Sequence, residues 1–375
     1  MKVGIITFHK TKNYGACLQA LALQVTLEKL GAEVSIVDYM PEIIQQTYTN
    51  FSLKKYHRVL KKSPVKALRI LASDVIYCVP NHKLNKAFQL FYQKYYKLSP
   101  RRYRTYTELQ SNPPTLDCCF TGSDQVWNCD ITNGYDPAFF LEFGQPSMIR
   151  ASYAASMGRE KLSDSEKIDF TKHLSGLEHI SLRESAAATV VSAISNVKAC
   201  VSCDPTLLLS AEEWRNLFGL NDKPKEKYIF VYKLYQNPEL DKVVKLLAKK
   251  TGYKIVSIGN RAVYDNEVVI KDADPAKFVA LVSGAEFIVT NSFHGTAFSV
   301  NFNKPFYCVL GESRNSRMLG FLEKIQMEIR AKKQFSNEEI EAVTVDYTAA
   351  QQCLEQMREE SKKYICKCVE VKQHD

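Results

Sequence analysis

The sequence has no apolar run of the roughly 18 residues that a membrane-spanning helix needs, so it predicts no transmembrane helix. Low-complexity tracts and internal repeats are also absent. Residues 1–9 contain too short an apolar stretch for a secretory signal and predict a first β-strand. Hydrophobic residues make up 45% of the chain and charged residues 24%, which is typical of a soluble globular protein. We therefore expect a cytoplasmic location.

Motifs for common cofactors are missing as well. No G-x-G-x-x-G follows a predicted strand, which excludes the usual dinucleotide fingerprint. The 11 cysteines include a C-x-x-C pair, Cys200 and Cys203, but no second pair or nearby histidine completes a metal site. Without a secretory signal, this many cysteines indicates buried thiols in a reducing compartment. We expect neither a metal nor a cofactor.

The net charge of +9 owes much to basic residues between Lys54 and Arg104. Such a surface suits nucleic acid, an anionic membrane face or a phosphorylated substrate. No nucleic-acid motif accompanies it, and aromatic residues nearby recur at helical spacing, which favours a core role (Phe88, Phe91, Tyr92, Tyr95 and Tyr96). We predict a small anionic substrate and no nucleic acid. A lipid-phosphate carrier, with peripheral membrane contact, is one interpretation of the basic segment.

Strand and helix periodicities alternate along most of the chain. An apolar run at residues 2–8, a helical pattern at 18–30 and a second strand at 34–39 form a βαβ opening, which predicts parallel strands. Residues 42–110 are basic, aromatic and helical in pattern, and predict a helical insertion. The alternation then resumes. The sequence therefore predicts an α/β fold.

The chain of 375 residues is too long for one ordinary core, which favours two domains. Residues 219–227 are polar and rich in turn formers, as a linker would be. We predict an N-terminal domain at 1–218 and a C-terminal domain at 219–375, whose last helices pack back on the first. Pockets favour such junctions, so a cleft between the domains is expected.

The segment from Thr290 to Thr296 is the most informative part of the chain. It follows an apolar strand pattern and precedes a helical one, so it predicts a strand, a tight turn and a helix. A helix start attracts anions, and His294 in the turn can exchange protons near neutral pH. Alternatively, His294 caps its own helix or packs against the sheet.

Polar turns follow other predicted strands too. Each carries groups that can bind an anion or a hydroxyl, and the candidates are Asn13, Tyr14, Gly15, Ser123, Asp124, Gln125, Trp127, Arg183, Asn291, Ser292, His294, Gly295 and Thr296. Other roles remain open for several of them. Asp124 can cap a helix, Trp127 can belong to the core, Arg183 can form an ion pair with Glu184, and Asn13 and Tyr14 can shape their loop.

Taken in order, these blocks resemble the polysaccharide pyruvyl transferase family over about residues 1–330. The matching blocks are Ile5-Ile6-Thr7-Phe8, Asn13-Tyr14-Gly15-Ala16, Thr121-Gly122-Ser123-Asp124-Gln125-Val126-Trp127, Ser181-Leu182-Arg183-Glu184, Asp204-Pro205-Thr206 and Ser292-Phe293-His294-Gly295. The resemblance implies two Rossmann-like domains in a GT-B-like arrangement. It also implies transfer of the carboxyvinyl unit of phosphoenolpyruvate onto a sugar, which closes a pyruvate ketal in surface polysaccharide biosynthesis.

On this resemblance His294 is the general acid and Asp124 orients or deprotonates a sugar hydroxyl. Arg183 grips the carboxylate or phosphate of phosphoenolpyruvate. Some family members carry an arginine two residues before the histidine, where this chain has Ser292. Either another cation replaces it, with Arg183, Arg314 and Arg317 as candidates, or the donor pocket differs.

Two other functions fit the same pattern. A nucleotide-sugar glycosyltransferase would use the strand end at Gly259-Asn260-Arg261 as its anchor. A non-catalytic glycan-binding relative would keep the fold without the chemistry. The acceptor sugar, and whether a lipid carries it, are not identified by the sequence.

Overall fold

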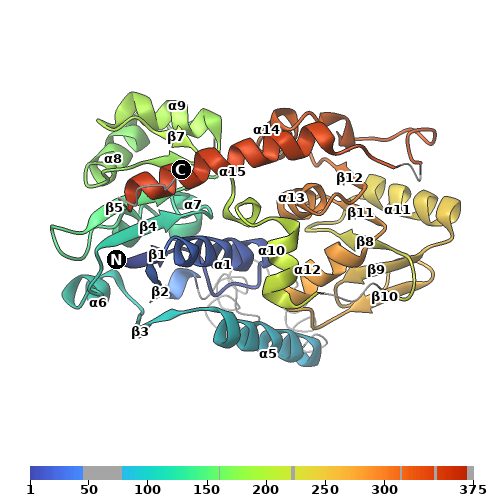
Figure 1. Cartoon of the computed structure of the whole chain (residues 1–375), viewed down its shortest axis with the longest axis horizontal. Helices are drawn as coiled ribbons and strands as arrows, with labels where there is room; N and C mark the ends of the chain where they lie inside the picture. The colour runs from blue at the N-terminus through green and yellow to red at the C-terminus, as the bar shows by residue number, and fades with distance from the viewer. Residues whose placement is uncertain (45–77, 160, 221–223, 313–314, 342–343, 370–375) are drawn as a thin grey trace, which may run out of the picture. The chain divides into compact units, whose positions relative to one another are not determined.

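Two parallel β-sheets organise the chain, one in each of two units (Figure 1). The computed structural model describes residues 1–44, 78–159, 161–220, 224–312, 315–341 and 344–369. Unit 1 comprises Met1–Asn81, Gln89–Leu208 and Arg358–Asp375, and unit 2 comprises His82–Phe88 and Leu209–Met357. No helix of the described residues is both long and apolar enough to cross a membrane.

The sheet of unit 1 has the strand order β3-β2-β1-β4-β5, with all neighbours parallel. Its strands are β1 (Lys2–Ile6), β2 (Glu33–Tyr39), β3 (Leu98–Tyr103), β4 (Cys118–Gly122) and β5 (Ile149–Tyr153). Two short strands, β6 (Ser181–Leu182) and β7 (Cys200–Val201), continue beside β5 through a parallel bridge between Ala155 and Leu182. The chain order reverses between β1 and β4, which is where open α/β sheets bind ligands.

Helices follow these strands in the order that a βαβ pattern predicts. They are α1 (Tyr14–Lys29), α5 (Cys78–Tyr95), α6 (Tyr106–Ser111), α7 (Cys129–Thr132), α8 (Asp164–Leu174) and α9 (Ser185–Ile194), with 3-10 turns η1 (Pro137–Phe140) and η2 (Pro205–Leu207). Helix α1 begins where the Asn13 side chain accepts the N–H of Ala16. It is alanine- and leucine-rich and buried over most of its length, as a helix packed on both sides must be.

The predicted helical insertion at 42–110 is wrong in part. Residues 45–77 lie outside the described residues, but Leu98–Tyr103 is a strand that pairs with β2 at the edge of the sheet. Its buried residues, Ser99 and Tyr103, are separated by three exposed ones, and Pro100 is tolerated because an edge strand has one unpaired side. Three consecutive polar or proline residues conceal this strand in the sequence.

The aromatic face of α5 is core, as its helical spacing indicates. Phe91, Tyr92 and Tyr96 are at most 9% exposed. The Tyr92 hydroxyl donates to the carbonyl of Thr11 at 2.7 Å, and the Tyr96 hydroxyl donates to that of Cys17 at 2.9 Å. These tyrosines thereby fix the loop between β1 and α1.

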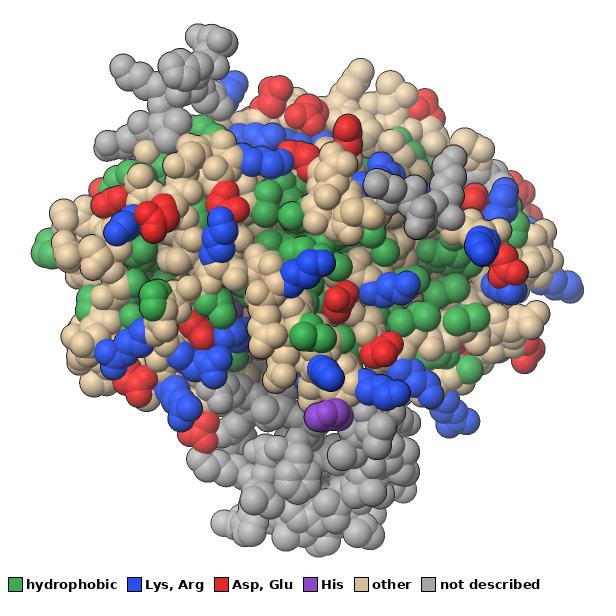
Figure 2. Space-filling view, turned by 60° about the horizontal axis from the view of Figure 1, so that its bottom comes forward, with side chains coloured by type: hydrophobic (Ala, Val, Ile, Leu, Met, Phe, Trp, Pro, Cys, Tyr) green, Lys and Arg blue, Asp and Glu red, His purple; other side chains and the backbone are tan. Residues whose placement is uncertain are grey.

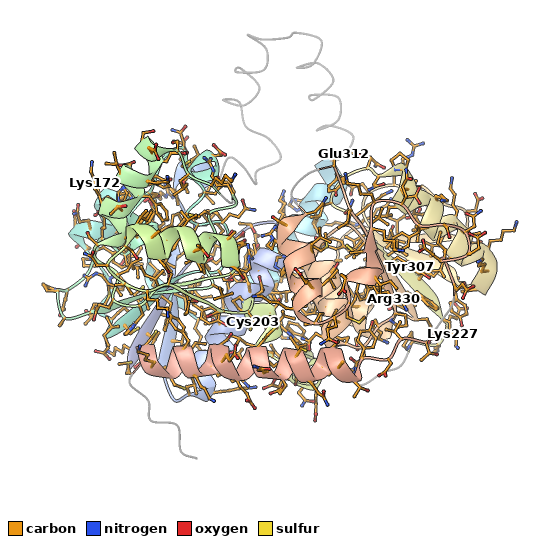
Figure 3. All side chains as sticks on the ribbon, turned by 90° about the horizontal axis from the view of Figure 1, so that it is seen from above. Lys172, Cys203, Lys227, Tyr307, Glu312 and Arg330 are labelled. Carbon is orange, nitrogen blue, oxygen red and sulfur yellow. The ribbon has the colours of Figure 1, made fainter. Side chains whose placement is uncertain are left out.

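Unit 2 repeats the same topology in the strand order β10-β9-β8-β11-β12-β13, again all parallel. Its strands are β8 (Tyr228–Tyr232), β9 (Lys254–Ile258), β10 (Glu267–Ile270), β11 (Phe287–Thr290), β12 (Phe306–Val309) and β13 (Ala331–Lys332). The helices are α10 (Ala211–Phe218), α11 (Pro238–Thr251), α12 (Pro275–Gly284), α13 (Phe293–Asn301) and α14 (Ser316–Lys324), with the 3-10 turn η3 (Glu328–Arg330). At its edge the Arg330 guanidinium covers the ring of Tyr307 at 5.9 Å (Figure 3).

The last helix, α15 (Thr348–Cys368), contributes to both units, because its residues from Arg358 onward belong to unit 1. There the Ser361 hydroxyl accepts the N–H of Cys203 at 3.0 Å, and the Tyr364 hydroxyl donates to the carbonyl of Ser152 at 2.8 Å. The predicted fold class, α/β with two Rossmann-like domains, is confirmed. In each unit the order reverses beside the first strand, at β1/β4 and at β8/β11.

Candidate functional site

The predicted histidine turn lies at the reversal point of unit 2. Strand β11 ends at Thr290, and Ser292 caps helix α13 by accepting the N–H of Gly295 at 3.4 Å. The strand, turn and helix therefore occur where the sequence predicts them. The apolar residues of β11 are followed by polar ones that stay buried.

Most polar side chains of this turn hold the backbone. The Asn291 amide accepts the N–H of Leu234 at 2.8 Å and donates to the carbonyl of Tyr235 at 3.1 Å, which ties the end of β11 to the loop after β8. The Thr296 hydroxyl contacts the Met318 sulfur at 3.3 Å. Asn291, Ser292 and Thr296 are at most 4% exposed, so they shape the site rather than line its surface.

Gly295 is required for close packing rather than for ligand contact. A Cβ added there would lie 2.4 Å from the Thr290 Oγ1, which itself donates to the carbonyl of Tyr232 at 2.6 Å. Gly320, in the middle of α14, has nothing within 4 Å of an added Cβ. Gly295 and Gly320 are both helical glycines, and they differ in whether an added methyl group has space, so one serves as the control for the other.

We expect Gly295→Ala to destabilise unit 2 by roughly 1–3 kcal/mol, because the methyl group overpacks the turn. Gly320→Ala should instead stabilise it by roughly 0.5–1 kcal/mol, since alanine is the better helix former where space is open. Urea unfolding followed by Trp214 fluorescence, in a Trp127→Phe background, measures both. Equal effects of the two substitutions would contradict this interpretation.

His294 differs from its neighbours because its ring is half-buried. The imidazole contacts the Phe293 ring edge to face at 5.3 Å between ring centres. The Arg317 guanidinium, from α14, lies over the same Phe293 ring at 5.3 Å. The His294 imidazole and the Arg317 guanidinium thus both pack against the Phe293 ring. Arg314, the other predicted cation of this region, lies outside the described residues.

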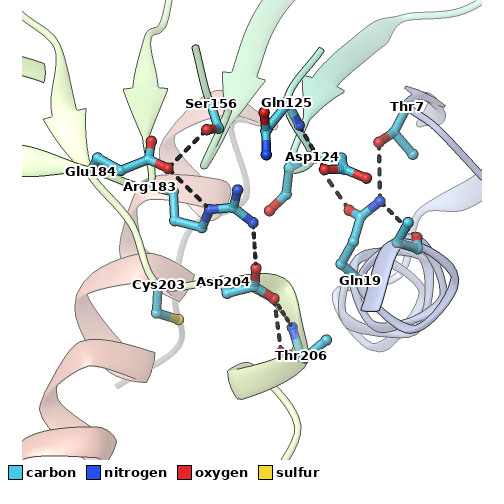
Figure 4. Close-up of polar contacts among 12 residues, drawn as sticks. Thr7, Gln19, Asp124, Gln125, Ser156, Arg183, Glu184, Cys203, Asp204 and Thr206 are labelled. Carbon is cyan, nitrogen blue, oxygen red and sulfur yellow. Dashed lines mark hydrogen bonds and ion pairs between the residues drawn. The ribbon is translucent and has the colours of Figure 1, made fainter. Parts of the chain in front are cut away.

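Unit 1 gathers a second polar cluster at the carboxyl ends of its strands (Figure 4). Arg183 follows β6, and its Nη1 donates to the Asp204 carboxylate at 2.9 Å while its Nε lies 3.5 Å from Glu184. The Ser156 hydroxyl, after β5, donates to Glu184 at 2.8 Å. The Arg183 side chain is 4% exposed.

The charge of Arg183 is stabilised by protein carboxylates. Burial disfavours the cation, but Glu184, Asp204 and Asp124 more than compensate and raise the pKa of Arg183. The predicted grip on a substrate anion is therefore not the role that this geometry favours. Arg183 instead forms a buried ion pair that fixes the ends of β6 and β7, the alternative that the adjacent Glu184 suggested.

Gln19 joins the two strands at the reversal point of unit 1. Its amide donates to the Thr7 hydroxyl at 3.0 Å and accepts the N–H of Ser123 at 3.3 Å, so it links the ends of β1 and β4 (Figure 4). Sequence reasoning missed this residue, although a glutamine within an apolar helix is a detectable signal. Asp124 comes directly after Ser123 in the chain and is partly exposed. Its carboxylate accepts the N–H of Gln125 at 2.7 Å.

Other predicted residues of unit 1 have structural contacts. The Gln125 side-chain oxygen, Oε1, accepts from the Asn128 side-chain amide at 2.7 Å. Tyr14 is 6% exposed at the start of α1, beside the capping Asn13 and the buried Gly15. Trp127 is 1% exposed, stacks on Phe140 at 5.4 Å and donates to the carbonyl of Phe139 at 2.9 Å. Trp127 is therefore a core residue, the alternative given for it above, and its prediction as a binding residue is corrected.

Among the residues that the structure describes, no group of three or more His, Cys, Asp or Glu side chains could hold a metal ion. Of the predicted residues, those that are partly exposed are Asn13, Asp124 and Gln125 in unit 1 and His294 and Arg317 in unit 2. The pair in unit 2 comprises an imidazole and a guanidinium, groups suited to proton transfer and to binding an anion.

The two units are both α/β, each with a Rossmann-like parallel sheet. The sequence profile of the polysaccharide pyruvyl transferase family matches residues 13–313. The chain belongs to this family, whose members are transferases that act on polysaccharide. A search of curated proteins finds no match to the sequence.

Solved structures with the same fold include sugar-nucleotide enzymes. The UDP-GlcNAc 2-epimerase from Methanocaldococcus jannaschii is 11% identical, with a TM-score of 0.50 over 99% of this chain and 100% of that chain. The UDP-GlcNAc 2-epimerase from Neisseria meningitidis, solved with UDP-GlcNAc, is 11% identical, with a TM-score of 0.48 over 99% and 100% of the two chains. At this identity the likeness of the first establishes the fold alone.

Proposed function

We propose that this protein transfers the pyruvyl unit of phosphoenolpyruvate to two hydroxyls of a sugar, forming a pyruvate ketal in surface polysaccharide biosynthesis. The observation that carries the proposal is the half-buried His294 imidazole, which lies inside the segment that the family profile matches. It shares the Phe293 ring with the Arg317 guanidinium, which lies just beyond that segment. Phosphoenolpyruvate is a cytoplasmic metabolite, so the protein would act in the cytoplasm. No metal or cofactor takes part in this scheme.

The side chains present match the requirements of the reaction. His294 would protonate C3 of phosphoenolpyruvate as a general acid, while Arg317 and the N-terminus of α13 would hold its negative groups. Each sugar hydroxyl oxygen then bonds C2, and the bond from C2 to the phosphate oxygen breaks. One hydroxyl proton replaces the proton given by His294, and the other leaves with phosphate. Asp124 would orient or deprotonate a hydroxyl.

A nucleotide-sugar glycosyltransferase is the second candidate. The fold shared with the UDP-GlcNAc 2-epimerase favours it, and Gly259-Asn260-Arg261 directly follow β9, where a nucleotide could be held in such a sheet. The two candidates consume different donors, so one experiment separates them.

The test is incubation of the full chain with phosphoenolpyruvate and a panel of saccharides, some of them lipid-linked. We expect release of inorganic phosphate and a product carrying one pyruvyl ketal, detected by mass spectrometry. Parallel incubations with nucleotide sugars should release no nucleotide. Turnover of a nucleotide sugar without use of phosphoenolpyruvate would replace the first candidate by the second.

A further inference from the structure

A cluster of charged side chains lies at the edge of the unit 1 sheet formed by β1, β2 and β3, and neither candidate reaction uses it. Asp38, near the end of β2, is its centre. The Lys10 Nζ lies 2.7 Å from Asp38 Oδ2, and the Arg102 Nε, from β3, lies 3.0 Å from the same oxygen. His9 Nε2 lies 3.2 Å from Asp38 Oδ1. All four residues belong to unit 1.

Positive charge exceeds negative charge in this cluster. Lys10 and Arg102 are cations and share a single carboxylate. His9 is fully buried, and its other nitrogen lies 3.1 Å from the carbonyl of Thr7. Burial alone would raise the pKa of Asp38, but hydrogen bonds from His9, Lys10 and Arg102 hold it below its usual value. The Asp38 carboxylate is therefore ionised, and its single negative charge is less than the positive charge of Lys10 and Arg102 together.

The two cations keep donors available. The Arg102 side chain is 54% exposed, and its terminal nitrogens have no partner within the described part of the chain. Lys10 uses one contact of its ammonium for Asp38, and its side chain is 15% exposed. Burial lowers the pKa of Lys10, which indicates that water solvates this cation poorly. A second anion beside Asp38 would give the Lys10 ammonium the contacts that water does not supply.

We propose that Lys10 and Arg102 bind a phosphate group, with the Arg102 fork donating two hydrogen bonds and Lys10 adding a point charge. Guanidinium matches phosphate geometry, and an excess of positive charge suits a group with more than one negative charge. The identity of the source rests on the proposed function: a glycan acceptor carried on a diphosphate lipid would present such a group. Free phosphate has the same chemistry. Figure 2 shows Lys and Arg side chains at several places on one face, so a matched surface control is needed.

The test measures binding of inorganic diphosphate, inorganic phosphate and phosphatidylcholine vesicles containing a polyprenyl diphosphate, without phosphoenolpyruvate. The variants are Arg102→Gln and Lys10→Gln. Arg101→Gln is the control, because Arg101 is exposed on the same strand and lies over the Tyr103 ring at 5.7 Å. We expect Arg102→Gln and Lys10→Gln to weaken diphosphate binding by about tenfold or more, and Arg101→Gln by about twofold or less, since charge-assisted contacts are the stronger ones.

Circular dichroism should give the same melting temperature for Arg102→Gln and Arg101→Gln. If the Arg102 and Lys10 variants lose binding to the vesicles alone, the lipid headgroup is the source of the phosphate. If they lose binding to soluble phosphate alone, free phosphate is the source. Equal affinities of the Arg102 and Arg101 variants, or no binding to any of the three probes, would overturn the proposal. Because phosphoenolpyruvate is absent, a failure here leaves the ketal-forming reaction to its own test.

Discussion

Replacing His294 by asparagine should lower pyruvyl transfer by about 10²–10⁴-fold, the usual contribution of a general acid. Asparagine keeps a polar side chain of similar reach but cannot deliver a proton at neutral pH. Ketal formation depends on protonation of C3, so phosphate release and ketal product should fall together. Initial rates with phosphoenolpyruvate and an acceptor found in the saccharide panel measure the effect.

His173→Gln is a suitable control. His173 is a half-buried residue of α8 in unit 1, where its ring stacks on Phe140 at 4.8 Å and its Nδ1 contacts Glu142. It should retain most of the activity. Full pyruvyl transfer by His294→Asn would contradict the role of His294 as general acid, whereas a non-catalytic glycan-binding protein would show no pyruvyl transfer and would keep its glycan binding in this variant.

The largest stability effect is expected for Arg183→Met. Removing this buried guanidinium leaves Asp204 and Glu184 without their cation, and breaking a buried ion pair in this way costs about 3–5 kcal/mol. The Asp204 side chain is fully buried, so water cannot replace the lost partner. Urea unfolding followed by Trp127 fluorescence in a Trp214→Phe background measures the free energy of unfolding of unit 1.

Arg159→Met provides the comparison for this experiment. Arg159 also contacts two carboxylates, Asp130 and Glu166, each at 2.6 Å, but its side chain is 28% exposed and Asp130 is 77% exposed. Its loss should cost about 1 kcal/mol or less, because exposed ion pairs contribute little. Adding Asp204→Asn to Arg183→Met should recover part of the stability. A cost for Arg183→Met as small as that for Arg159→Met would show that Arg183 is not the buried ion pair described here.

Local patterns were most reliable where a single segment decides its own structure. The strand, turn and helix around His294 follow from an apolar run, a capping serine and a helical repeat, all within about a dozen neighbouring residues. The βαβ opening and the aromatic face of α5 were predictable for the same reason. Strand β3 was not, because its pairing with β2 overrides a polar sequence with a proline in it.

The roles of the predicted site residues depended on partners that the sequence does not reveal. Trp127 lies beside a polar turn in the sequence, yet the rings of Phe140 and Phe170 enclose it. Arg183 acquires Asp204 from 21 residues further along, and Asp38 acquires Lys10 and Arg102 across 28 and 64 residues. Adjacent residues gave no sign of these pairs.

The sequence by itself therefore determined the α/β class, the family and the position of the histidine turn, since these depend on residue periodicity, capping and the order of short motifs. Only the tertiary structure decided which charges neutralise one another, which rings are inaccessible and where cations remain in excess. Parallel strands bring their carboxyl ends to one edge of a sheet whatever their separation along the chain, and burial there decides which contacts are strong.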